Sequence, residues 1–132
     1  MNWQAKAKQR QVLVIDDMSV IRHLLMEIMK RLNFECAGAS NGRVALDLLS
    51  RKKFDLVLCD WNMSGMTGSE LVKAIRTAYP DLPIIMVTAE NEPDRVKELR
   101  NLGVRGYIVK PFKPPALIKV VEKLFPPQAD NN

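Results

Sequence analysis

The sequence is short of the residues on which several classes of protein depend. Its 132 residues include only two cysteines and one histidine. Two cysteines cannot build a disulfide framework, and their spacing matches no zinc ligand pattern. The longest apolar runs, 12–15 and 84–87, are far below the roughly 18 residues that a membrane span needs. We therefore expect a soluble, cytoplasmic protein without membrane insertion, with Cys36 and Cys59 as buried, reduced thiols.

Five short apolar segments alternate with five segments of helical spacing. Apolar strands that are each followed by a helix are typical of a parallel sheet covered on both faces. No repeat or low-complexity segment interrupts this pattern, so we predict one doubly wound α/β domain. The expected strands are 11–16, 35–39, 54–60, 83–88 and 106–110. The expected helices begin near Ser19, Asn41, Ser69, Pro93 and Pro114, the first three of which are candidate N-caps.

Reactive polar residues stand at the end of four of the five expected strands. They are Asp16 with Asp17, then Asp60, Thr88 and Lys110. The carboxyl ends of parallel strands share one edge of the sheet, where ligands bind. Three carboxylates about 5 Å apart would repel each other by roughly 3 kcal/mol per pair at an effective dielectric constant of about 20. A hard cation offsets that repulsion, so we predict an Mg²⁺ site in which Asp60 is a nucleophile for phosphoryl transfer.

Several motifs resemble one known family. The segments VLVIDDMS, LCDWNMSGMTG, MVTAE and GYIVKPF are together similar to the receiver domain of two-component response regulators, over about residues 11–125. Within that family the chain resembles the stand-alone chemotaxis regulators of the CheY type. The resemblance implies a flavodoxin-like (βα)5 fold with strand order 2-1-3-4-5. It also implies a sensor histidine kinase or a phosphotransfer protein as partner, and a phosphoacceptor that catalyses only its own phosphotransfer and dephosphorylation rather than an enzyme.

The resemblance assigns a role to each residue of the expected metal site. Asp60 matches the phosphoacceptor of the family. Asp17 matches a direct Mg²⁺ ligand, and Asp16 matches one that acts mainly through water. Asn62 matches the residue whose backbone carbonyl completes the metal shell. In place of the family's usual proline the chain has Ser64, which predicts a looser loop.

The resemblance also assigns the switch residues. Thr88 and Lys110 match the groups that bind the phosphoryl oxygens. Tyr107 matches an aromatic residue that turns inward when Thr88 is drawn to the phosphate. The Lys110–Pro111 peptide bond matches one that is cis in the family.

Charge is distributed unevenly along the chain. Residues 11–94 carry nine basic and twelve acidic groups, whereas residues 95–125 carry eight basic and two acidic groups. We expect the basic surface to meet an acidic segment of a target protein. Because no recognition motif or aromatic platform accompanies the charge, we do not expect nucleic acid as the partner. The residues predicted to form this output face are Lys97, Arg100, Arg105, Lys119 and Lys123.

The remaining expectations concern the tails, the assembly and the rival functions. We expect a basic disordered tail over 1–10, a domain over 11–125, a second disordered tail over 126–132, and a monomer or weak dimer. One rival is a receiver-like adaptor that binds without phosphorylation. Another is a small phosphatase of the haloacid dehalogenase type, which is disfavoured because Asn62 stands where that family has an acid/base aspartate. A flavodoxin is disfavoured because no hydroxyl-rich loop follows the first strand.

Overall fold

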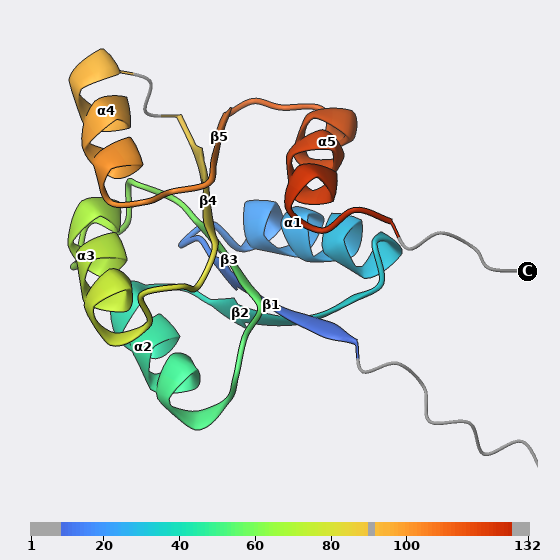
Figure 1. Cartoon of the computed structure of the whole chain (residues 1–132), viewed down its shortest axis with the longest axis horizontal. Helices are drawn as coiled ribbons and strands as arrows, with labels where there is room; N and C mark the ends of the chain where they lie inside the picture. The colour runs from blue at the N-terminus through green and yellow to red at the C-terminus, as the bar shows by residue number, and fades with distance from the viewer. Residues whose placement is uncertain (1–8, 90–91, 128–132) are drawn as a thin grey trace, which may run out of the picture.

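The computed structural model describes residues 9–89 and 92–127 and shows five strands that alternate with five helices (Figure 1). The alternation follows the predicted order of elements, with boundaries that differ by one or two residues. In chain order the elements are β1 (Arg10–Ile15), α1 (Ser19–Arg31), β2 (Phe34–Ala39), α2 (Gly42–Arg51), β3 (Leu56–Cys59), α3 (Gly68–Ala78), β4 (Ile84–Thr88), α4 (Pro93–Asn101), β5 (Gly106–Val109) and α5 (Pro114–Leu124).

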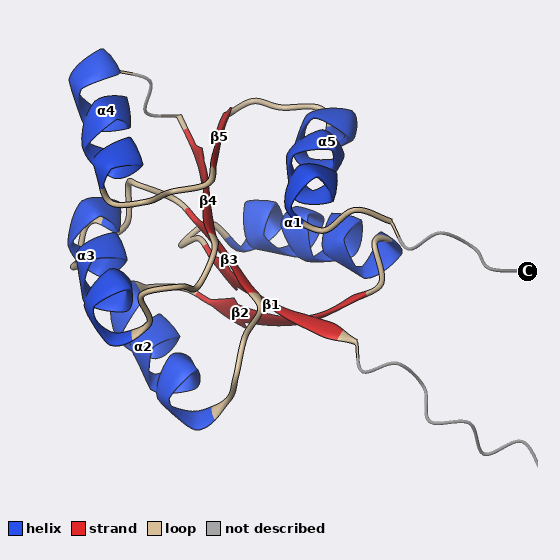
Figure 2. Ribbon diagram, viewed as in Figure 1, coloured by secondary structure: helices blue, strands red, loops and turns tan. Residues whose placement is uncertain are grey.

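All five strands lie parallel in one sheet, in the order β2-β1-β3-β4-β5. This order confirms the predicted fold class. Helices α1 and α5 cover one face of the sheet, and α2, α3 and α4 cover the other (Figure 2). The order reverses between β1 and β3, because β2 lies outside β1 while the later strands continue in the other direction. The carboxyl ends of β1 and β3 therefore flank the switch point, where such sheets bind their ligands.

Two apolar layers hold the helices to the sheet. Successive side chains of a strand point to opposite faces, so Leu13 and Ile15 pack toward α2 and α3 whereas Val12 and Val14 pack toward α1 and α5. All four side chains are at most 1% exposed. Burial on both faces explains why the strands are apolar at every position rather than at alternate ones.

Two of the three predicted helix caps are wrong. Helix α1 begins at Ser19 itself, after Met18, because the Met18 N–H is already bound by the Asp16 carboxylate. Helix α3 begins one residue before Ser69. Its N-cap is Thr67, whose hydroxyl accepts a hydrogen bond from the Glu70 N–H at 3.2 Å.

The third predicted cap is confirmed. Asn41 caps α2 by accepting a hydrogen bond from the Val44 N–H at 2.9 Å. At α3 the cap is reciprocal, because the Glu70 carboxylate accepts from the Thr67 N–H at 3.1 Å. Hydrogen bonds from the Thr67 backbone and side chain lower the pKa of Glu70. The capping box therefore stabilises the fold at pH values above the ordinary pKa of a glutamate. This stabilisation is lost as the pH falls through the lowered pKa of Glu70.

Arg76 joins two turns at the end of the sheet that lies away from the predicted site. Its guanidinium donates hydrogen bonds to backbone carbonyls of both the α3–β4 turn and the α4–β5 turn. The acceptors are the carbonyl oxygens of Leu102 at 3.0 Å, Tyr79 at 3.2 Å, Pro80 at 2.8 Å, Leu82 at 2.9 Å and Gly103 at 3.4 Å. A guanidinium suits this role because its several N–H donors diverge in one plane.

The first strand and the last helix mark the ends of the described secondary structure. Strand β1 begins at Arg10, and the Gln9 side chain donates a hydrogen bond to Asn33 at 2.9 Å. The predicted tails lie mostly within 1–8 and 128–132, which are outside the described residues. Within the part of the chain that is described, no helix is long and apolar enough to cross a membrane.

We predict that Thr67→Ala lowers the free energy of unfolding by about 1 kcal/mol, because it leaves the first turn of α3 without its side-chain cap. Urea denaturation of both proteins at neutral pH measures the difference. Thr77→Ala is the matched control, since that exposed hydroxyl only bonds back to the Lys73 carbonyl within the same helix. Equal losses in the two variants would contradict the role of Thr67.

The two thiols differ in accessibility, and a labelling experiment can separate them. Burial raises the pKa of Cys59, with added repulsion from Asp60 and Asp16, and burial also raises the pKa of the half-buried Cys36. We predict that iodoacetamide at pH 8 labels Cys36 more slowly than a free cysteine and leaves Cys59 unlabelled until urea unfolds the protein. Peptide mass spectrometry measures both. Rapid labelling of Cys59 in the native protein would contradict this result.

Candidate functional site

The predicted site residues meet at one edge of the sheet. Asp16 follows β1, Asp60 follows β3, Thr88 ends β4 and Lys110 follows β5, and these strands are successive neighbours in the sheet. The backbone holds them in step, because the Asp60 N–H bonds to the Ile15 carbonyl at 3.1 Å and the Lys110 N–H to the Thr88 carbonyl at 2.8 Å. Asp16 and Lys110, which are 94 positions apart in the sequence, thus share one site.

Three carboxylates form the centre of the site. One oxygen each from Asp16, Asp17 and Asp60 lies within 4.8 Å of the other two. Asp16 is fully buried and Asp60 is 6% exposed, whereas Asp17 is exposed to solvent. Carboxylate oxygens beside open solvent are the ligand set that Mg²⁺ prefers, because that ion keeps several of its waters. The donor set therefore fits the predicted metal.

Lys110 neutralises part of this charge. Its Nζ lies 2.7 Å from Asp16 Oδ2 and 3.2 Å from Asp60 Oδ2. Burial acts to lower the pKa of Lys110, but hydrogen bonds and charges from the two aspartates outweigh that effect, so the pKa is raised and the amine stays protonated. One cation against three carboxylates leaves two negative charges, which a divalent ion would balance.

Backbone N–H groups orient two of the carboxylates. Asp16 Oδ1 accepts a hydrogen bond from the Met18 N–H at 3.0 Å, and Asp60 Oδ1 faces the Asn62 N–H at 3.4 Å. The structure thus brings the Asn62 peptide next to Asp60, where the resemblance placed a metal ligand. Both carboxylate oxygens of Asp16 accept hydrogen bonds, one from the Met18 N–H and one from Lys110, so the orientation of this buried side chain is fixed.

The predicted switch residues lie on the next two strands of the sheet after β3, Thr88 on β4 and Tyr107 on β5. Thr88 is fully buried, and Tyr107 is half-buried on β5 against the core layer that α4 covers. Thr88 pairs with Val109 in the sheet, and Met86, two residues before Thr88, pairs with Tyr107. Alternate residues of a strand share a face, so Thr88 and Tyr107 project from the same face of the sheet. The Lys110–Pro111 peptide bond is cis, as the resemblance implied.

Trp61 is buried although it directly follows the site carboxylate. Its side chain is only 8% exposed and belongs to the core under α2 and α3. The guanidinium carbon of Arg95 on α4 lies 5.5 Å from the centre of its ring, in cation–π geometry. Strand β3 is apolar throughout, and burial continues past its end through Asp60 and Trp61.

Gly68 is a site residue that the sequence did not indicate. A Cβ on Gly68 would lie 2.5 Å from the Trp61 Cα and 2.7 Å from the Asp60 carbonyl oxygen, both of which are backbone atoms. The start of α3 therefore packs directly on the peptide that carries Asp60. The signal in the sequence was a glycine at the first position of the helix, directly after its cap Thr67 and before Ser69.

The predicted output residues are all exposed, and four of the five border two grooves. Arg100 and Arg105 border a groove of about 200 Å³ between α4 and β5 that Tyr107 also lines. Lys119 and Lys123 border another groove, on α5. Lys97 lies on the exposed side of α4. None of the five forms an ion pair with a residue in the described part of the chain, so this charge is available to a partner.

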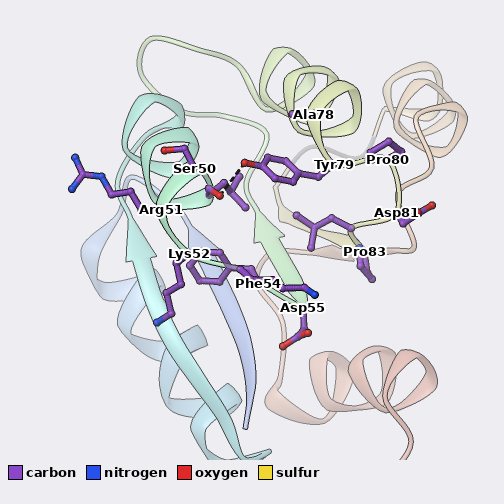
Figure 3. Close-up of a pocket in the computed structure, with 13 residues that line it drawn as sticks. Ser50, Arg51, Lys52, Phe54, Asp55, Ala78, Tyr79, Pro80, Asp81 and Pro83 are labelled. Carbon is purple, nitrogen blue, oxygen red and sulfur yellow. Dashed lines mark hydrogen bonds between the residues drawn. The ribbon is translucent and has the colours of Figure 1, made fainter. Parts of the chain in front are cut away.

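A cavity of about 770 Å³ lies at the opposite end of the sheet, between the α2–β3 and α3–β4 turns (Figure 3). Phe54 and Tyr79 contribute to its walls, and the Tyr79 hydroxyl donates a hydrogen bond to the Leu49 carbonyl at 2.9 Å. The exposed basic run 51–53 borders it. Because the carboxylates are at the other end of the strands, this cavity takes no part in the site.

Comparison with known proteins agrees with this geometry. The family model for the response regulator receiver domain matches residues 12–122 of this chain. The chain belongs to the response regulator receiver family. It is 40% identical to the chemotaxis protein CheY of Pseudomonas aeruginosa, over 86% of this chain and 94% of that protein. It is 38% identical to the chemotaxis protein CheY-3 of Vibrio cholerae, over 89% of this chain and 93% of that protein.

Solved structures give the same result. The chemotaxis protein CheY4 of Vibrio cholerae superposes with a TM-score of 0.83 at 36% identity, over 88% of this chain and 98% of that one. A response regulator receiver protein from Pseudomonas putida has a TM-score of 0.83 at 28% identity, over 89% of this chain and 98% of that one. The receiver is therefore of the CheY-like kind found in two-component systems.

We predict that Gly68→Ala weakens Mg²⁺ binding and lowers the free energy of unfolding by about 1–3 kcal/mol, because the methyl group must displace the backbone beneath Asp60. Titration with Mg²⁺ followed by tryptophan fluorescence, together with urea denaturation, measures both. Gly65→Asn is the matched control: Gly65 has φ +84°, a Cβ there would meet nothing within 4 Å, and asparagine tolerates that conformation. Wild-type Mg²⁺ affinity in Gly68→Ala would contradict the packing argument.

Proposed function

We propose that this receiver accepts a phosphoryl group on Asp60, from a histidine kinase or a phosphotransfer protein, in the presence of Mg²⁺. The observation that carries the proposal is the convergence of Asp16, Asp17 and Asp60 at the carboxyl edge of the sheet, with the Lys110 amine bound to Asp16 and Asp60. A nucleophilic carboxylate, a metal site and a fixed cation are the parts that phosphoryl transfer requires.

The chemistry proceeds by displacement at phosphorus. An oxygen of Asp60 forms a bond to the phosphorus of the donor while the bond from phosphorus to the donor's nitrogen breaks, and that nitrogen takes up a proton. The product is an aspartyl phosphate on the protein. Bound Mg²⁺ would stabilise the charge on the transferring oxygens, held by Asp16, Asp17, Asp60 and the Asn62 peptide.

Other residues around the site meet the new charge. Phosphorylation adds about −1.5 to −2 charges at neutral pH. Lys110 would turn part of its interaction from Asp16 and Asp60 to the phosphoryl oxygens, and the Thr88 hydroxyl would donate to them. The phosphoryl group is attached to the chain's own carboxylate, so the protein is itself the molecule that is modified. In this proposal it is a signalling switch rather than an enzyme.

The readout we propose is a change in binding to a partner protein. Tyr107, which shares a face of the sheet with Thr88, borders the groove of Arg100 and Arg105. The cations there favour an acidic segment of the target. Because its relatives are chemotaxis proteins, we propose a role in chemotaxis or another form of motility in the cytoplasm.

The test is to mix the protein with phosphoramidate and Mg²⁺ and to follow intact mass and tryptophan fluorescence. We expect the mass of one phosphoryl group to be added to wild type and to the control Asp81→Asn, an exposed carboxylate outside the site. We expect no addition to Asp60→Asn, or to wild type in excess EDTA. Addition to Asp60→Asn would refute Asp60 as acceptor. No addition to wild type would favour an adaptor that binds without phosphorylation.

A further inference from the structure

Helix α4 is weakly held by the apolar core. Of its nine residues, only Leu99 is buried. The other helices each bury two or more side chains. Such a helix can change position at low cost in free energy. What fixes it must therefore be sought among its polar contacts.

The first set of contacts joins α4 to helix α3 and to Trp61, the residue after Asp60. Glu98 Oε1 accepts a hydrogen bond from the Ser69 hydroxyl at 2.8 Å and lies 3.6 Å from Lys73 Nζ. One turn earlier on α4, Arg95 covers the ring of Trp61. Ser69 is 8% exposed and lies next to Gly68 at the start of α3. The contacts with Ser69 and Trp61 thus end on residues at or beside the close approach of α3 to the Asp60 peptide.

The second set of contacts fixes the opposite end of α4. Arg76 donates hydrogen bonds to the carbonyls of Leu102 and Gly103, at 3.0 and 3.4 Å. Arg76 also binds three carbonyls of the α3–β4 turn, so its own position is fixed by the body of the domain. The carboxyl end of α4 is therefore anchored to the body of the domain, whereas Glu98 attaches the rest of the helix to α3 and Arg95 attaches it to Trp61.

We propose that Ser69 is a positioning residue that couples the Asp60 site to α4, with Arg76 as the fixed pivot. This inference rests on the proposed phosphorylation of Asp60 and names a route for its regulation that does not pass through Tyr107. The Ser69–Glu98 hydrogen bond holds α4 in its unphosphorylated position. A group added at Asp60 moves the loop, weakens that bond and lets the amino end of α4 swing.

The close packing at Gly68 explains why the loop must transmit a displacement. There is no space for even a methyl group between α3 and the backbone of Asp60 and Trp61. A shift of the Asp60 peptide is therefore passed to Ser69 rather than absorbed. By linkage, a bond that favours the unphosphorylated arrangement opposes binding at Asp60 by the same free energy.

The experiment measures binding of beryllofluoride, a phosphoryl analogue, with saturating Mg²⁺ by tryptophan fluorescence. We expect Ser69→Ala and Glu98→Ala to bind beryllofluoride about two- to ten-fold more tightly than wild type, the effect of one hydrogen bond. Glu98→Gln keeps the acceptor oxygen and should stay close to wild type. Ser50→Ala is the matched control, because that hydroxyl bonds only to the Asp47 carbonyl within α2.

Hydrogen exchange in the absence of beryllofluoride provides a second readout. In Ser69→Ala we expect faster exchange over 95–98, with residues 102–104 unchanged because Arg76 still holds them. Unchanged or weaker beryllofluoride binding in Ser69→Ala, with normal binding in wild type, would overturn this inference and leave the proposed function intact. Absence of beryllofluoride binding in wild type would overturn the proposed function, and this inference with it.

Discussion

Repulsion among carboxylates is the constraint on which the rest of this structure depends. The parallel sheet brings Asp16, Asp17 and Asp60 together whether or not their charges favour it, because strand order alone decides which carboxyl ends are neighbours. Solvent screens the charges of Asp16 and Asp60 poorly because both side chains are buried. Lys110 offsets only part of the repulsion. The fold therefore leaves a deficit of positive charge at one defined point, and that deficit makes the site a receptor for a cation and, with it, for a phosphoryl group.

The weak burial of one helix explains why the polar contacts around the site carry so much of the geometry. The core fixes the sheet and four of the helices through buried apolar layers. Helix α4 has one fully buried residue and depends on Glu98, Arg95 and the carbonyls that Arg76 binds. Contacts of this kind have preferred geometries and break over short distances. A small movement at the site can thus alter them, whereas the same movement would leave a packed helix in place.

The features that could be predicted from the sequence are those set by the spacing of apolar residues and by the residues at the ends of the strands. The five strands, their order and the convergence of Asp16, Asp60, Thr88 and Lys110 follow from apolar runs that each end in a polar residue and from the family resemblance. The caps were harder, because several neighbouring residues can cap a helix and only the local backbone selects between them. Met18 precedes α1 because the Asp16 carboxylate binds its N–H, and Lys110 fixes that carboxylate from 94 positions away.

Tertiary contacts of single residues could not be predicted. A glycine in a loop usually indicates a turn with positive φ, as Gly65 does, but Gly68 is required by the close approach of its own backbone to that of Asp60 and Trp61. Trp61 adjoins a solvent-facing site, yet its ring lies in the core and contacts a helix more than thirty residues later. Ser69 carried a hydroxyl suited to a cap, and the structure uses that hydroxyl across the gap between α3 and α4 instead. In each case the sequence shows the chemical group, and only the packing of helices decides what the group contacts.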